Sequence, residues 1–322
     1  MRLLKLVPDN TNIDFMRWRN VALVLSIIVT VASIVLVVVR GLNLGVDFVG
    51  GQQIRVTFAQ AAPVQEIRET VASLDVGDAT IQTFGDPKTI SMRMGLPQGG
   101  EEAANKVATK VRTAISAKHP DAKFAVDTVS GKVSNELYRS GAISIALAML
   151  GIAIYIWLRF EWQFGVGALV TLFHDVCMTL GFFSLTQLEF NLNVVAAILT
   201  IVGYSLNDTV VIYDRIRENL RKYRKMDIVP LLNLSLNETL SRTMVTSLSI
   251  MFALTALLVL GPDVIFGLTI AILIGIFVGT YSSIYISSPI LVWLKVSGDS
   301  FLPKNAVAAS GAERVTSPTE GA

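Results

Sequence analysis

The sequence is poor in cysteine, in histidine and in charge. Its 322 residues include one cysteine and two histidines, and 16% of them are Asp, Glu, Lys or Arg. A lone cysteine, Cys177, excludes a disulfide bond within the chain, and two histidines leave few ligands for a metal site. The low charge, a hydrophobic content of 52% and a mean hydropathy of +0.57 exclude an ordinary soluble domain.

Long apolar stretches account for this composition; the third is broken only by His174 and Asp175, the fourth only by Asp208, and the others contain no charged residue. A membrane-spanning helix needs ~20 apolar residues, and six runs approach or exceed that length: 21–39, 140–158, 165–185, 192–213, 244–260 and 264–294. The first run exceeds a signal-peptide core, and Arg40-Gly41 is a poor cleavage site, so we interpret it as an anchor. The last run is long enough to tilt or to leave the bilayer near Pro289. We therefore predict an α-helical polytopic membrane protein with six transmembrane helices.

The runs divide the chain into five predicted parts. These are an N-terminal arm (1–20), a first transmembrane helix (21–40), an outside domain (41–137), a five-helix membrane region (138–296) with a basic loop at 214–242, and a disordered tail (297–322).

The distribution of Lys and Arg predicts the orientation. These residues gather in the arm, in the loop 214–242 and after the last run, whereas the short connections 186–191 and 261–263 have none. Because Lys and Arg mark the cytoplasmic side, both termini are predicted to be cytoplasmic. The basic residues lie close to the ends of the spans, so we expect membrane lipid and not nucleic acid around them.

The outside domain has the pattern of a small α+β fold. Alternating apolar residues predict strands at 53–58, 79–84, 89–94 and 123–129, and helical periodicity predicts helices at 63–74 and 101–118. The order β-α-β-β-α-β is that of a ferredoxin-like domain. It contains no paired acids and no nucleophile–base spacing, so we predict a docking or mobile module, not an enzyme, with no metal and no cofactor.

An acid, Asp208, lies inside the fourth apolar run. A charge at the centre of a membrane helix costs roughly 2.5–3.5 kcal/mol on insertion scales, so such residues are usually functional. At 100° per residue, Asp208 shares one helical face with Thr200, Gly203, Tyr204 and Asn207. We interpret this face as a relay for protons or sodium ions. The alternative is that Asp208 is a structural hydrogen-bond partner.

Two further polar features of the runs each allow two interpretations, and a series of small residues predicts packing. Arg242 opens a run of only 17 residues, 244–260, so it is either drawn inward toward Asp208 or an ordinary cytoplasmic flank. His174 and Asp175 form either a second proton-handling site or a structural pair. Small residues recur every four positions in the last run and predict close helix packing: Gly275, Gly279, Ser283 and Ser287.

Two motifs resemble a known family. Residues 45–51, which read Gly-Val-Asp-Phe-Val-Gly-Gly, resemble the G-[IV]-D-F-x-G-G signature of the SecD/SecF protein-export family. Residues 202–209, continuing to 214–219, resemble the signature of the SecF branch of that family. His174-Asp175 and Arg242-Thr243 match as well, whereas residues 129–134 lack the proline expected before the second span.

The resemblance implies a subunit of the bacterial inner membrane with a periplasmic domain. Such a subunit pairs with a SecD-like half, as in the resistance–nodulation–division superfamily. The resemblance further implies that the pair works with the SecYEG channel, SecA and YajC. Its clients would be unfolded polypeptides, and its energy source the proton-motive force. By motif match, Asp208 is the proton-binding carboxylate, Arg242 its cationic partner, and Tyr204 and Asn207 part of the same relay. The matched coupling motif consists of Gly45, Asp47, Phe48, Gly50 and Gly51.

Two other functions fit parts of the pattern. Half of a proton-coupled small-molecule or lipid efflux transporter of the same superfamily has the same intramembrane acid. A purely structural assembly factor needs the close packing at Gly275 and Gly279 but not the acid.

Overall fold

The computed structural model describes residues 11–77, 79–84, 86–97 and 99–296. Half of the predicted arm and the whole predicted tail, 297–322, lie outside these residues. Among the described residues, six helices are long and apolar enough to cross a membrane, which agrees with the predicted number of spans. The spans are α1 (Arg19–Arg40, preceded by η1, Phe15–Trp18), α5 (Gly131–Arg159), α6 (Trp162–Thr186), α7 (Leu192–Lys222), α8 (Ile228–Leu260) and α9 (Phe266–Tyr285, preceded by η2, Asp263–Ile265), which continues into α10 (Ser287–Trp293).

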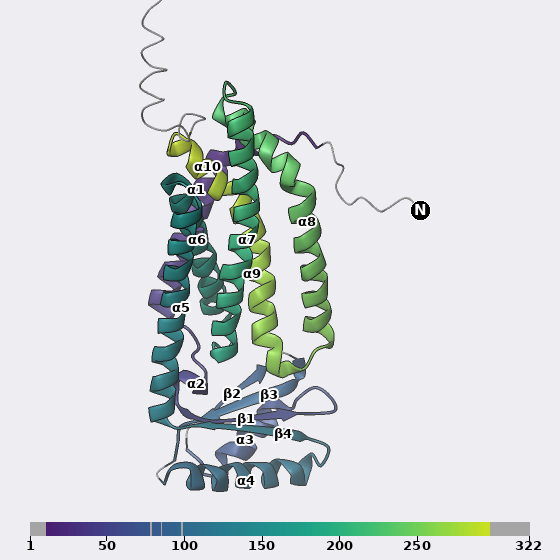
Figure 1. The fold of residues 1–322 in the computed structure, drawn as a ribbon. Helices are drawn as coiled ribbons and strands as arrows, with labels where there is room; N and C mark the ends of the chain where they lie inside the picture. The colour runs from purple at the N-terminus through teal and green to yellow at the C-terminus, as the bar shows by residue number, and fades with distance from the viewer. Residues whose placement is uncertain (1–10, 78, 85, 98, 297–322) are drawn as a thin grey trace, which may run out of the picture.

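The long helices form a bundle that stands on a separate sheet domain (Figure 1). Helix α7 packs along α9 in the centre, and α6 packs against both of them and against α1. The outer helices turn large apolar side chains away from the bundle, such as Val38 at 78% and Phe252 at 70% exposure. Side chains of this kind fit a lipid environment and not water.

The last membrane helix is interrupted shortly before Pro289. Helix α9 ends at Tyr285, and α10 begins at Ser287 after the single residue Ile286. The ring of Pro289 cannot donate a backbone hydrogen bond and would clash with the carbonyl of Tyr285 in a continuous helix. The break therefore lies one turn before the proline.

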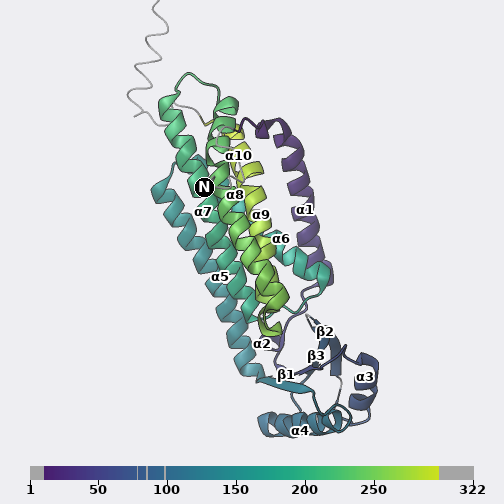
Figure 2. The ribbon, with the colours of Figure 1, turned by 90° about the vertical axis from the view of Figure 1, so that its right-hand side faces the viewer.

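The sheet domain has the predicted order of elements. It consists of β1 (Gly51–Thr57), α3 (Val64–Ala72), β2 (Ala79–Phe84), β3 (Asp86–Met94), α4 (Gly100–Lys118) and β4 (Lys123–Val129). The antiparallel sheet has the strand order β2-β3-β1-β4. Helices α3 and α4 cover the face turned away from the bundle (Figure 2), and the core between them includes Ile54, Ile67 and Val111.

The connection predicted as a basic loop, 214–242, is mostly helical. Helix α7 continues to Lys222 and α8 begins at Ile228, so only residues 223–227 connect them. The reason is that the apolar face of α7 continues beyond the uncharged run: Ile216 and Leu220 stay buried against the first turns of α8.

The boundary between the domain and the second span also differs from the predicted position at 137/138. Helix α5 starts at Gly131, directly after β4, and the Ser130 side chain accepts a hydrogen bond from the backbone N–H of Val133. Domain and membrane helix are therefore joined without a linker.

Candidate functional site

Asp208 lies in the interior of the bundle. Its side chain is 3% exposed, and its Oδ2 atom is buried without a hydrogen-bond partner. The Ser247 hydroxyl of α8 and the positive charge of Arg242 are close enough to interact with the carboxyl group. Within the described residues, no ion pair closer than 4.0 Å joins Asp208 and Arg242. The acid is therefore buried but is not locked to a cation.

A chain of hydroxyl groups runs from Ser247, beside the acid, to two other helices. The Tyr204 hydroxyl of α7 lies 3.1 Å from Ser247 Oγ, which in turn lies 2.9 Å from Thr280 Oγ1 of α9. Ser247 and Thr280 were not predicted; the only signal for them is a hydroxyl group inside an apolar run. The network joins three helices beside Asp208.

The polar face predicted around Asp208 divides into a buried and an exposed part. Asp208 is buried and Tyr204 half-buried, whereas the other members are exposed, as are polar residues of the neighbouring helix α8. We call the exposed residues of both helices the polar strip: Thr200, Gly203 and Asn207 of α7, and Arg242, Thr246 and Ser249 of α8. Polar residues at this depth call for a protein partner or water rather than lipid.

His174 and Asp175 lie on α6 in a second buried cluster. Asp175 is completely buried, and its Oδ1 atom lies 2.9 Å from Nδ1 of His174. Its Oδ2 atom accepts hydrogen bonds from Ser205 Oγ of α7 at 2.5 Å and from Ser282 Oγ of α9 at 2.9 Å. The two serines were not predicted, because their contact with Asp175 depends on how three helices pack.

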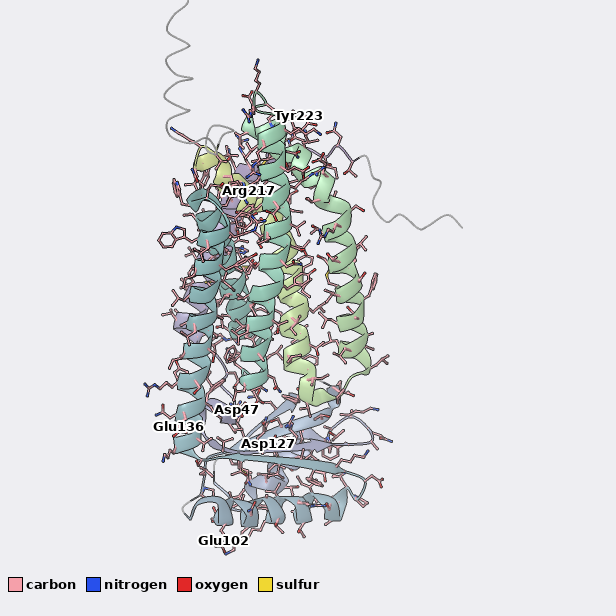
Figure 3. The ribbon with its side chains drawn as sticks, in the orientation of Figure 1. Asp47, Glu102, Asp127, Glu136, Arg217 and Tyr223 are labelled. Atoms are coloured by element: carbon pink, nitrogen blue, oxygen red, sulfur yellow. The ribbon has the colours of Figure 1, made fainter. Side chains whose placement is uncertain are left out.

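The predicted coupling motif connects the sheet domain to the start of α7. Gly45 donates its backbone N–H to the carbonyl of Phe190 at 2.8 Å, and Asp47 accepts a hydrogen bond from the N–H of Leu192 at 2.9 Å. Phe48 packs its ring against Phe190. Figure 3 shows Asp47 where the domain meets the bundle, whereas Arg217 lies at the other end. The Asp47 carboxylate lies at the positive N-terminus of α7, where it stabilises the helix.

The two final glycines of the motif sit at a tight crossing. Gly51 has φ of 128°, and a Cβ atom there would lie 2.5 Å from the carbonyl oxygen of Met94. A Cβ atom at Gly50 would lie 3.2 Å from the Cα of Gly131. Only glycine fits at Gly51 without movement of the neighbouring strand.

Glu189, in the connection between α6 and α7, was not predicted. Its Oε2 atom accepts a hydrogen bond from Nε2 of Gln53 in β1 at 2.6 Å. Burial raises the pKa of Glu189 above its usual value, and the nearby Arg93 charge and the Gln53 hydrogen bond oppose this only in part. A cavity of about 290 Å³ lies beside it, lined in part by Ser91 and Arg93. A lone acid in a six-residue connection is the only sequence signal for this contact.

The two glycines of α9 lie against α7. A Cβ atom at Gly275 would lie 2.3 Å from Cγ1 of Ile201, and one at Gly279 would lie 3.3 Å from Cβ of Ser205. Among the described residues no three potential ligands gather as a metal site.

The fold and the buried acids define a polytopic membrane protein with ionisable groups inside its helix bundle and one domain carried between its first two spans. Residues 108–297 match the family model of the protein export membrane protein SecD/SecF, C-terminal, and residues 35–62 match that of the SecD/SecF GG motif. The chain belongs to the SecD/SecF family of protein-export membrane proteins.

Individual relatives agree with the family models. The chain is 43% identical over 291 residues to the protein translocase subunit SecF of Rickettsia rickettsii, with 89% of this chain and 94% of the relative covered. It is 42% identical over 294 residues to SecF of Pseudomonas aeruginosa, with 91% and 95% covered.

Solved structures of SecDF share the fold. The SecDF crystal structure from Thermus thermophilus is 31% identical with a TM-score of 0.81 over 90% of this chain. SecDF in a super-membrane-facing form is 32% identical with a TM-score of 0.65 over 95% of this chain. The chain spans 40% of each SecDF chain.

Proposed function

We propose that this chain is the SecF-type subunit of the Sec protein-export machinery, and that it uses the proton-motive force to promote export of polypeptides across the bacterial inner membrane. The observation that carries the proposal is Asp208, which is 3% exposed, has one unpartnered oxygen and forms no close ion pair within the described residues. An ionisable group in this position is a candidate for binding and releasing a proton.

The polar strip supports a SecD-type partner. Its residues on α7 and α8 would face lipid if the chain worked alone, and a second membrane half would cover them. The distribution of Lys and Arg supports cytoplasmic termini and a periplasmic sheet domain. The expected assembly also contains the SecYEG channel, SecA and YajC, with unfolded polypeptide as the client.

Movement of α7 would link the proton site to the domain. Protonation removes the charge of Asp208 and with it the attraction to Arg242, so that the helices repack. Asp47 holds the N-terminus of α7, which lies about 24 Å from Asp208 at 1.5 Å per residue. The membrane potential supplies about 2.3 kcal/mol per charge per 100 mV, which is enough to shift an equilibrium of a few kcal/mol.

Half of a small-molecule or lipid efflux transporter is the competing function, since it would use the same acid. Identity to SecF subunits over nine-tenths of their length favours export. A pull-down in mild detergent separates the two: export requires recovery of a SecD-like subunit together with the Sec channel.

The test of the proton site is the Asp208→Asn variant, assayed for export in inverted membrane vesicles with and without a proton gradient. We expect the stimulation by the gradient to be lost, because the amide cannot be ionised. Asp214→Asn is the control, since Asp214 is on the same helix but its side chain is 44% exposed and pairs with Arg159. Normal stimulation in Asp208→Asn would refute the role of Asp208.

Arg242 is tested separately. Arg242→Met should reduce the stimulation and Arg242→Lys should retain part of it, since the positive charge remains. Full activity of Arg242→Met would leave Arg242 as an orientation signal only.

A further inference from the structure

The Asp175 cluster is built differently from the site around Asp208. Both oxygens of Asp175 have partners, and these come from three helices: His174 on α6, Ser205 on α7 and Ser282 on α9. Asp175 is 0% exposed. A fully buried carboxylate is retained only when its charge is compensated by hydrogen bonds or a cation, because its desolvation is costly.

Among the groups that contact Asp175, His174 is the one whose side chain can carry a positive charge. On α7 the acid nearest to Ser205 is Asp208, three residues beyond it, and the phenol of Tyr204 is adjacent in sequence. Helix α9 has no acid or base, and its ionisable groups are the phenols of Tyr281 and Tyr285. Helix α10 has no charged residue, and the charged residues of α1 and α5 lie toward the ends of these helices. His174 and Asp175 therefore share one hydrogen bond inside the bundle, and a proton bound by the pair can reside on either the imidazole or the carboxyl group.

Each partner also tolerates protonation of the carboxyl group. Ser282 Oγ has a second acceptor, the carbonyl oxygen of Gly279, at 3.1 Å. A protonated Asp175 can donate to Ser205, because a hydroxyl group also accepts hydrogen bonds. The absence of a side chain at Gly279 gives the carboxyl group its space, since a Cβ atom there would lie 3.7 Å from Asp175 Oδ2.

The cluster shares two helices with the Asp208 site. Ser205 lies one turn from Asp208 on α7, about 4.5 Å along the axis toward the sheet domain. On α9, Ser282 is two residues from Thr280, which bonds to Ser247 beside Asp208. A change in the bonds of Asp175 therefore acts on the same two helices that hold the proposed proton site.

We propose that Asp175 and His174 form a second proton-binding site, which holds α6, α7 and α9 together when the carboxyl group is ionised. When the carboxyl group is protonated, it keeps a hydrogen bond to Ser205 of α7 with the direction reversed and releases Ser282 of α9 to the carbonyl of Gly279. This inference rests on the proposed proton-driven function, and it adds a second protonation step on the same pair of moving helices.

The experiment is an infrared pH titration of the purified full-length chain in nanodiscs. The background variant is Asp208→Asn, so that the carboxyl band of Asp208 is absent. We expect a carboxyl C=O band to appear on acidification, and to be missing when Asp175→Asn is added. Glu136→Gln, which removes an exposed acid on α5, is the control and should leave that band unchanged.

Two further variants separate protonation from structural support. The side-chain oxygen of asparagine can still accept hydrogen bonds from Ser205 and Ser282. If the role of Asp175 is purely structural, Asp175→Asn should therefore keep normal gradient-dependent export. If Asp175 binds a proton, we expect this variant to lose the stimulation by the gradient at least tenfold. Ser205→Ala removes one donor and should shift the carboxyl band of Asp175 in frequency, which tests the site even if Asp175→Asn does not fold.

The inference is overturned if no carboxyl band depends on Asp175, or if Asp175→Asn exports normally. Failure of the proposed function gives a different result. In that case Asp208→Asn alone retains the stimulation by the gradient, whereas the carboxyl band of Asp175 still appears in the infrared titration.

Discussion

Replacing Gly275 with alanine introduces a methyl group into the contact between α7 and α9. Its Cβ atom would lie 2.3 Å from Cγ1 and 2.4 Å from Cδ1 of Ile201, whereas ordinary contacts are 3.4–4 Å. The helices must therefore separate by about 1 Å, or Ile201 must leave its rotamer. Overpacking of this kind costs about 1–3 kcal/mol.

Alanine also favours the helix over glycine by about 1 kcal/mol, which offsets part of the steric cost. Gly151→Ala on α5 is the matched control, since a Cβ atom at Gly151 has no neighbour within 4 Å. The difference between the two variants isolates the steric term, which we expect to be about 1–3 kcal/mol. The measurement is the free energy of unfolding in mixed micelles as the fraction of SDS is raised.

A second substitution tests the named contact. Ile201→Ala removes all three atoms that the new methyl group would strike. In this background Gly275→Ala should no longer be destabilising, and the coupling energy between the two positions should be about 1–3 kcal/mol. Equal effects of Gly275→Ala and Gly151→Ala, or strictly additive effects in the double variant, would refute the reasoning.

Two more predictions concern the junction between domain and bundle. Because burial raises the pKa of Glu189 above 4.5, the native state binds more protons than the unfolded state in this pH range. The free energy of unfolding should therefore fall as pH rises from 4.5 toward the raised pKa. Glu189→Gln should flatten this dependence of thermal stability on pH, and an unchanged dependence would contradict the assignment. Asp47→Ala should destabilise the start of α7 by about 1 kcal/mol, because the N–H of Leu192 loses its carboxylate partner. We expect faster amide hydrogen exchange confined to the first turn of α7. Exchange equal to that of the unmodified protein would contradict this prediction.

The sequence was sufficient for features that repeat along one element. Apolar runs predicted the six spans and alternation predicted the strands, because both patterns follow from burial of one segment at a time. The basic stretch after Asp208 was assigned to a loop because it is charged, yet Ile216 and Leu220 continue the buried face of α7 through it.

Contacts between elements could not be predicted in this way. Asp208 and Asp175 were recognised as acids in apolar runs, but the serines that bond to Asp175 come from α7 and α9, whose rotation about their axes is set by packing. Glu189 was missed for the same reason, since its partner Gln53 lies on a strand 136 positions away.

The two covalent connections of the sheet domain lie side by side. The chain enters through Gly50 and leaves through Gly131, and Gly51 pairs with Val129 where β1 begins and β4 ends. A body held along one edge can tilt about that edge but cannot slide across the bundle. Gln53 and Arg93 lie on the face of the same sheet opposite α3 and α4, and they bond to Glu189 and to residues 43–44. Any tilt of the domain about this edge would have to break these hydrogen bonds.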